Sequence, residues 1–262
     1  EPAVADLSWL QLTGIFLTFV WSGFVRSGLG FGGAALALPF LLLISDRPVV
    51  FLPIIAIHLL VFSSITVWQS HRNRPKATDT EHAEGSINWR YLRTVILILL
   101  IPKLVGVFGL LTLPDAVMSG IIFVIVGLYS ITYILQMPFR SNSKWLDGVF
   151  LALGGYISGT SLVGAPLIIA VVSQKIPRFQ LRDTLFVLWF ILVCIKLTAF
   201  IAFDVDLQLI HQLWLLPAAA IGHVMGLRFH TRLLKTEATR FYQGLGWVLL
   251  ITSGIGVAQL WL

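Results

Sequence analysis

Long apolar runs follow one another along nearly the whole chain, and short stretches rich in Pro, Gly and charge separate them. A helix that crosses a bilayer needs roughly 20 consecutive apolar residues, and most of the runs approach that length. The pattern therefore predicts an all-α polytopic membrane protein. The ten predicted segments are 8–25, 29–44, 50–69, 92–113, 116–137, 146–158, 162–173, 185–203, 209–227 and 244–262.

Two of these segments, 146–158 and 162–173, are too short to cross the membrane. At 1.5 Å per residue each reaches about 20 Å, whereas the hydrocarbon core is roughly 30 Å thick. They predict a hairpin that enters the membrane and returns, with Gly159, Thr160 and Ser161 at its tip. The longest polar stretches are 70–90, a predicted charged loop, and 228–240, a predicted amphipathic helix at the membrane interface.

An internal repeat divides the chain into two halves. The stretches 27–34 (S-G-L-G-F-G-G-A) and 158–165 (S-G-T-S-L-V-G-A) share the pattern S-G-x-x-x-x-G-A, and the residues from Gly106 resemble those from Gly222. Each half holds five segments, and because five is odd the second half must run inverted relative to the first. We therefore predict two inverted repeats, 1–137 and 138–262, with Gly-rich broken helices or re-entrant hairpins. In such transporters the substrate site lies near the midplane between the halves, so Gly30 and Ser161 should approach each other there.

Composition agrees with a membrane location. Hydrophobic residues make up 57% of the chain and charged residues only 11%, whereas a soluble domain carries about 25% charged residues. The net charge of +6 lies mostly in alternate loops, which predicts topology with both termini outside rather than nucleic-acid binding. The chain has one cysteine, Cys194, so no zinc–cysteine or iron–sulfur site is expected, and we predict neither a metal nor a cofactor.

Three basic residues lie within or beside apolar segments. Lys103 and Lys196 fall inside segments and Arg26 at the first break, while the acidic residues lie at segment ends or in loops. A charge at membrane depth costs several kcal/mol unless it is solvated or paired. Three cations without an acid at similar depth predict a site for an anion. The alternatives are lysines that extend to the membrane surface and an arginine that anchors to phospholipid.

Backbone N–H groups at the two breaks and nearby hydroxyls complete the predicted site. His58 is a candidate proton relay, with a packing role as the alternative, and the same packing role is the first interpretation of His223. Thr160 and Ser161 are candidate donors, although such hydroxyls also bond their own helix. The predicted substrate-binding residues are Arg26, Ser27, Gly28, Gly30, Gly32, Gly33, His58, Lys103, Gly159, Thr160, Ser161, Gly164 and Lys196.

The stretch 28–33 also fits G-x-G-x-x-G, but apolar runs of span length flank it, and the nearest following acid, Asp46, sits at a membrane edge. The S-G-L-G-F-G-G-A-A-L-A-L-P stretch at 27–39, S-G-T-S-L-V-G-A-P at 158–166 and G-H-V-M-G-L-R-F-H-T-R-L at 222–233 instead resemble the TauE/SafE family. The resemblance implies a secondary transporter, not an enzyme, that exports sulfite or an organosulfonate such as sulfoacetate across the bacterial inner membrane. Its partners would be a small anion and lipid. An anion channel, a structural subunit of a membrane complex and an intramembrane hydrolase remain alternatives, although no nucleophile-elbow pattern supports the last.

The loop charges generate a test of topology. In a chain whose Cys194 is replaced by Ser, single cysteines introduced at Arg74, Arg140, Arg178 or Arg232 should resist an impermeant thiol reagent applied to intact cells, because these loops carry the cytoplasmic excess of positive charge. Permeabilised cells, in which all four positions should react, provide the control. Strong labelling from outside at any two of the four loops would overturn the assignment.

Overall fold

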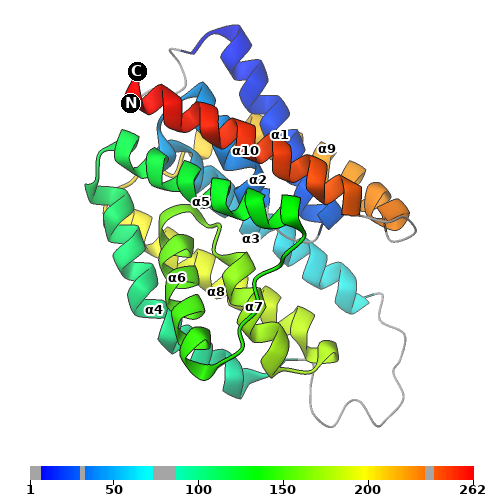
Figure 1. The fold of residues 1–262 in the computed structure, drawn as a ribbon. Helices are drawn as coiled ribbons and strands as arrows, with labels where there is room; N and C mark the ends of the chain where they lie inside the picture. The colour runs from blue at the N-terminus through cyan, green and yellow to red at the C-terminus, as the bar shows by residue number, and fades with distance from the viewer. Residues whose placement is uncertain (1–6, 30–32, 73–86, 234–238) are drawn as a thin grey trace. The chain divides into compact units, whose positions relative to one another are not determined.

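The computed structural model describes residues 7–29, 33–72, 87–233 and 239–262, and within these ranges the chain forms ten helices and no strand (Figure 1). This confirms the predicted all-α class. The inverted relation of the two halves stays a prediction. The helices are α1 (Trp9–Leu29), α2 (Gly33–Ile44), α3 (Pro48–Arg72), α4 (Trp89–Thr112), α5 (Asp115–Leu135), α6 (Lys144–Ser161), α7 (Ala165–Lys175), α8 (Arg178–Ala202), α9 (Leu209–Leu233) and α10 (Thr239–Trp261).

The helices pack into two compact units that do not follow the order of the sequence. Unit 1 comprises Glu1–Ile54, Gly109–Pro138 and Val205–Leu262, and unit 2 comprises Ile55–Phe108 and Phe139–Asp204. Unit 1 therefore holds α1, α2, α5, α9 and α10, while unit 2 holds α6, α7, α8 and most of α3 and α4. Each unit combines helices from both predicted repeats. The division of the chain into repeats at 137/138 stays a prediction, and it does not coincide with the boundaries of the packed units.

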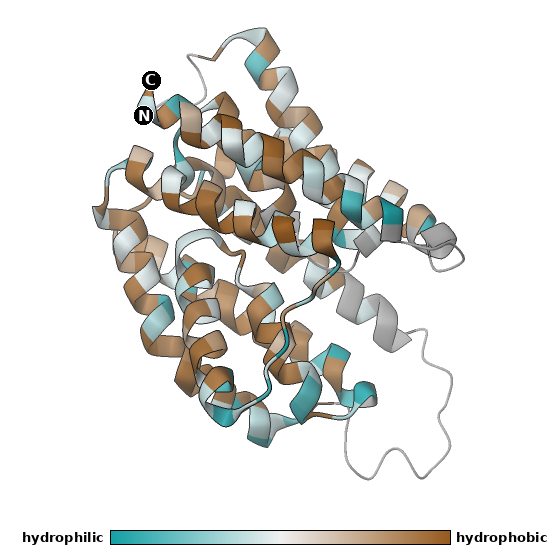
Figure 2. Cartoon of the chain, in the orientation of Figure 1, coloured by the Kyte–Doolittle hydropathy of each residue, from teal (hydrophilic) through white to brown (hydrophobic). Residues whose placement is uncertain are grey.

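Within the part of the chain that the structure describes, six helices are long and apolar enough to cross a membrane. On one of them, α4, the exposed fractions are 70% for Leu97, 71% for Ile101 and 60% for Phe108, whereas Leu99 on the opposite face is fully buried. Large apolar side chains exposed in a row along a helix are typical of a surface that faces lipid. Figure 2 shows the same distribution, with hydrophobic residues along the helices and hydrophilic residues concentrated towards helix ends and loops.

In unit 1, α1 packs against α9 through glycines. A Cβ atom added at Gly222 would collide with the backbone carbonyl of Val20, and one added at Gly23 with that of Ala219. Gly226 lies in the same way against Phe24. Gly222 and Gly226 are four residues apart, the spacing that lets two membrane helices bring their backbones into contact.

The same kind of crossing recurs in unit 2, between α4 and α6. Cβ atoms at Gly106 and Gly159 would collide with the carbonyl oxygens of Tyr156 and Lys103, and one at Gly155 would lie 2.8 Å from the carbonyl oxygen of Leu99. Gly155 and Gly159 again have four-residue spacing. The first helix of each S-G-x-x-x-x-G-A motif thus crosses a partner helix, α9 or α4, at glycine contacts.

The break in the second motif lies slightly later than the sequence predicts. Gly159, Thr160 and Ser161 form the last turn of α6 instead of an irregular tip, and the chain leaves the helix at Leu162, whose φ of 61° is left-handed. Pro166 in the first turn of α7 then starts a new helix, because its ring suits the helical N-terminus. Likewise, residues 228–233 continue α9 rather than start a separate interfacial helix, and 234–238 lie outside the described residues.

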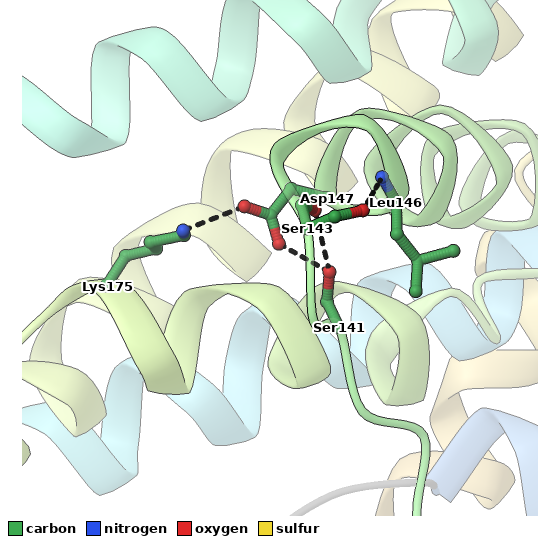
Figure 3. Close-up of polar contacts among 5 residues, drawn as sticks. All are labelled: Ser141, Ser143, Leu146, Asp147 and Lys175. Carbon is green, nitrogen blue, oxygen red and sulfur yellow. Dashed lines mark hydrogen bonds and ion pairs between the residues drawn. The ribbon is translucent and has the colours of Figure 1, made fainter.

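Polar contacts join the ends of α6 and α7 that lie away from this break (Figure 3). Ser143 caps α6 by accepting a hydrogen bond from the backbone N–H of Leu146 at 3.2 Å. Lys175, from the last turn of α7, lies 2.8 Å from the carboxylate of Asp147, which also accepts a hydrogen bond from Ser141 at 2.5 Å. The hydrogen bonds from Lys175 and then Ser141 lower the pKa of Asp147. The α6–α7 hairpin is therefore fastened at its open end.

The α4–α6 crossing generates a stability test within one helix. Gly155→Ala should lower the free energy of unfolding by about 1–3 kcal/mol, because its Cβ would overpack the backbone of Leu99. Gly148→Ala is the control, since no atom lies within 4 Å of its added Cβ, and a helical Gly-to-Ala change there should stabilise by up to about 1 kcal/mol. Thermal unfolding of the purified protein in detergent measures both. Equal effects of the two changes would show that the crossing is not closely packed.

The hairpin contact generates a pH prediction. Because the pKa of Asp147 is lowered in the folded protein, its stabilising contribution is present above the unfolded value of about 4 and is lost as pH falls through the folded value. Asp147→Asn should cost roughly 0.5 kcal/mol at neutral pH, a small value because Lys175 is 39% exposed. The difference from wild type should shrink below about pH 4. The exposed Asp204, changed to Asn, is the control. If Asp147→Asn and wild type differ in stability by the same amount at neutral pH and below about pH 4, the ion pair does not contribute.

Candidate functional site

Lys103 lies on the buried face of α4. It shares that face with Val95, Leu99, Val107 and Leu110, whose side chains are all at most 2% exposed, and the lysine itself is 0% exposed. The side chain therefore points into the protein rather than along the helix towards the membrane surface. Extension to the membrane surface, the alternative considered from the sequence, is not what this side chain does.

The ammonium group of Lys103 binds the last turns of α6. Its Nζ donates to the hydroxyl oxygen of Ser158 at 2.9 Å and to the backbone carbonyl of Ser158 at 3.3 Å. The glycine contact between Gly106 and α6 brings the two helices close enough for this bond. The same close approach that packs the helices thus positions the charge.

Lys196 reaches the same helix end from α8. Its side chain is 0% exposed, its Nζ donates to the carbonyl oxygen of Gly159 at 2.7 Å, and it lies 5.7 Å from the centre of the Phe200 ring. At that distance the aromatic face attracts the cation. The two lysines therefore bind adjacent carbonyls, those of Ser158 and Gly159, although they come from different helices.

These carbonyls belong to the negative end of the α6 dipole. The last carbonyls of a helix lack intrahelical partners, and cations near them are stabilised. In unit 2, within the described ranges, neither lysine has a carboxylate in salt-bridge distance, so the positive charge is stabilised by dipoles and an aromatic ring alone. Dipoles offset part of the cost of a buried cation, whereas an anion would offset more.

The N-terminus of α7 lies beside this cationic pair. Gly164, the residue before α7, packs so closely on α6 that its added Cβ would lie 3.0 Å from both Cβ and N of Ser158. No side chain caps α7, and the N–H groups at a helix N-terminus carry partial positive charge. Ser158 is thus the meeting point of an ammonium group, a hydroxyl and a helix N-terminus, a combination suited to an anion.

The hydroxyls of Thr160 and Ser161 are engaged within α6. Both side chains are 0% exposed, and each donates to the carbonyl oxygen of Ile157 at 3.0 Å. This is the self-bonding alternative considered from the sequence. Contact of either hydroxyl with a substrate stays a prediction that requires the hydroxyl to leave Ile157.

His58 belongs to unit 2 as well, but on α3. Its side chain is 1% exposed, and its ring packs edge-on against Phe62 with centroids 6.2 Å apart. This surrounding is typical of the packing alternative. A role for His58 as a proton relay stays a prediction.

Unit 1 holds a second basic group at the end of α1. The Ser27 hydroxyl forms a short hydrogen bond with Nδ1 of His223 on α9, and His223 is 8% exposed. The Nε and Nη2 atoms of Arg26 are buried, which fits an arginine directed into the protein better than one anchored to lipid headgroups. Gly28 packs against Gly226, with 3.5 Å from its added Cβ to the Gly226 oxygen.

The structure thus divides the predicted site between the units. It joins Lys103, Lys196, Gly159 and Gly164 around Ser158 in unit 2, and Arg26, Ser27 and Gly28 lie together at the end of α1 in unit 1. Gly33 begins α2, while Gly30 and Gly32 lie outside the described residues. The approach of Gly30 to Ser161 therefore stays a prediction.

Sequence reasoning missed two residues, Ser158 as the partner of Lys103 and His223 as the partner of Ser27. A signal for both existed. Ser27 and Ser158 are the first residues of the two copies of the repeated motif, and the stretch that begins at Gly222 contains His223. Side-chain partners across helices of different repeats could not be read from either copy alone.

The family model described as sulfite exporter TauE/SafE matches residues 15–255 of the 262-residue chain. No curated protein and no solved structure matches the chain. The match covers both copies of the motif and all ten helices at least in part.

Proposed function

We propose that this chain, which belongs to the sulfite exporter TauE/SafE family, binds sulfite or an organosulfonate such as sulfoacetate at the cationic pair of unit 2 and exports it across the bacterial inner membrane. Members of this family are multi-pass membrane transporters of sulfur-containing anions rather than enzymes. The substrate, the direction and the residues are the parts that we propose here.

The observation that carries the proposal is the pair of fully buried lysines on adjacent carbonyls of α6. An ammonium group has three N–H donors. Lys196 uses one of them on Gly159, which leaves donors for a ligand oxygen. A bound anion would give the ammonium groups a partner with a full negative charge in addition to the partial charges of the carbonyl groups. Charge-assisted hydrogen bonds are roughly twice as strong as neutral ones.

The donors of this site favour a group with several oxygens. Lys103 from α4 and Lys196 from α8 donate to the neighbouring residues Ser158 and Gly159, and Gly164, just before α7, packs against Ser158. A sulfonate or sulfite carries three oxygens on one sulfur atom, so one such group offers an acceptor to each lysine. A spherical halide would lack this directional match.

Release of the anion is eased by the same helix end. When the anion leaves, the lysines keep their hydrogen bonds to Ser158 and Gly159, so the ammonium groups of the empty site still have polar partners. The free energy of anion binding should therefore be moderate. We expect a dissociation constant between about 1 μM and 1 mM, which corresponds to about −8 to −4 kcal/mol.

Replacement of the lysines tests the proposal. Lys103→Met and Lys196→Met keep most of the side-chain length but remove the charge, so each should reduce sulfite and sulfoacetate flux into proteoliposomes by about tenfold or more, the effect of losing a charged hydrogen bond of roughly 1.5–3 kcal/mol. Lys144→Met is the matched control, because Lys144 is exposed at the start of α6 and should leave flux unchanged.

Size-exclusion profiles and thermal unfolding establish that the variants are folded. If folded Lys103→Met and Lys196→Met both carry the anions at wild-type rates, the lysines only cap α6 and the proposed site is wrong. Saturation of the wild-type flux with substrate, measured with chloride in parallel, separates a transporter from a channel. A flux that does not saturate and admits chloride equally would favour the channel.

A further inference from the structure

The serine that opens each copy of the repeated motif is bonded to a basic side chain of the helix that it crosses. In unit 2, Ser158 on α6 accepts from Lys103 on α4, and in unit 1, Ser27 on α1 is bonded to His223 on α9. Both crossings are made by glycines in backbone contact. The two couples therefore have the same construction, but one contains a lysine and the other a histidine.

We propose that His223 and Ser27 form a second anion-contacting couple, the counterpart in unit 1 of Lys103 and Ser158, and that it accepts the anion when the imidazole is protonated. This inference rests on the proposed function, because it assigns a further residue pair to the same class of anion. It concerns a residue whose first interpretation from sequence was packing.

The direction of the Ser27–His223 bond carries the argument. In the imidazolium form both ring nitrogens carry protons, so Nδ1 donates to the Ser27 oxygen. The hydroxyl proton of Ser27 is then available to an anion, as that of Ser158 is when Lys103 donates to it. A neutral ring with its proton on Nε2 instead accepts from Ser27, and the hydroxyl proton is no longer available.

The electrostatic setting of the couple is basic. Across the α1–α9 contact, Arg26 of α1 acts electrostatically on His223. His223 is 8% exposed, so a second positive charge beside Arg26 is poorly screened by solvent. An anion would stabilise the protonated ring beside the guanidinium, which links anion binding to uptake of one proton.

The His223 couple should consequently respond to pH. A free imidazole loses its proton near pH 6.5. Binding at the His223 couple should weaken as pH rises through the range in which the imidazole loses its proton. A packing role for His223 gives no such dependence.

The test measures the half-saturation concentration of anion flux in proteoliposomes between about pH 5.5 and pH 8, the interval that brackets a free imidazole. The probes are sulfoacetate and thiosulfate, since their charge is constant there, whereas sulfite itself gains a proton. The wild-type value should rise by about tenfold across this interval, equivalent to about 1.4 kcal/mol. In His223→Gln and in Ser27→Ala the rise should be clearly smaller than in the wild type.

His211→Gln is the matched control, because it makes the same replacement earlier in α9, where His211 bonds Trp214, and it should keep the wild-type profile. Should His223→Gln fail to fold, Ser27→Ala makes the same test, since it removes the hydroxyl and leaves the imidazole. A wild-type pH profile in either folded variant overturns the inference, as does a flat profile in the wild type. If the wild type carries neither probe at any pH, the proposed function itself is wrong and this inference fails with it.

Discussion

A positive charge inside a membrane protein needs a partner, and this requirement explains how unit 2 is built. Lys103 and Lys196 are both fully buried, and their partners are carbonyl oxygens at the end of a helix, the Ser158 hydroxyl and one aromatic ring. Such partners are available because α6 stops at Ser161: the carbonyl of Gly159 lies in its last turn, and that of Ser158 accepts both the N–H of Leu162 at 3.3 Å and the ammonium of Lys103. The helix break and the buried charge therefore depend on each other.

Glycine makes this arrangement possible. The lysine side chain on α4 reaches Ser158 because Gly106 and Gly159 let the two backbones touch, and Gly164 brings the start of α7 to the same residue. A methyl group at any of these positions would separate elements whose polar groups must meet. The glycines of this chain are thus requirements of the site as much as of the fold, and α1 and α9 repeat the arrangement around Ser27.

The all-helical class and most of the helix positions were predictable from sequence, because apolar runs of span length leave few alternatives. Lys103 and Lys196 were also predictable, since a lysine inside an apolar run is costly wherever it points. The exact end of α6 was not, because it depends on a left-handed Leu162 that no local pattern marks. Nor were the pairs Ser158–Lys103 and Ser27–His223, because they join helices that lie far apart in the sequence. The sequence also could not show that the hydroxyls of Thr160 and Ser161 donate to the carbonyl oxygen of Ile157. Whether a hydroxyl bonds its own helix or another group depends on the local geometry.

The contact of bare backbones between α4 and α6 has a mechanical consequence. Helices separated by long side chains can slide past each other when those side chains change rotamer. Helices whose main chains touch cannot adjust in this way, because displacement along the crossing would drive Gly159 into the carbonyl of Lys103. The α4–α6 crossing should therefore be rigid. The start of α7 is held in the same way, because a Cβ atom at Gly164 would collide with the carbonyl of Gly154. Any movement of unit 2 that accompanies transport should therefore carry α4, α6 and the start of α7 together.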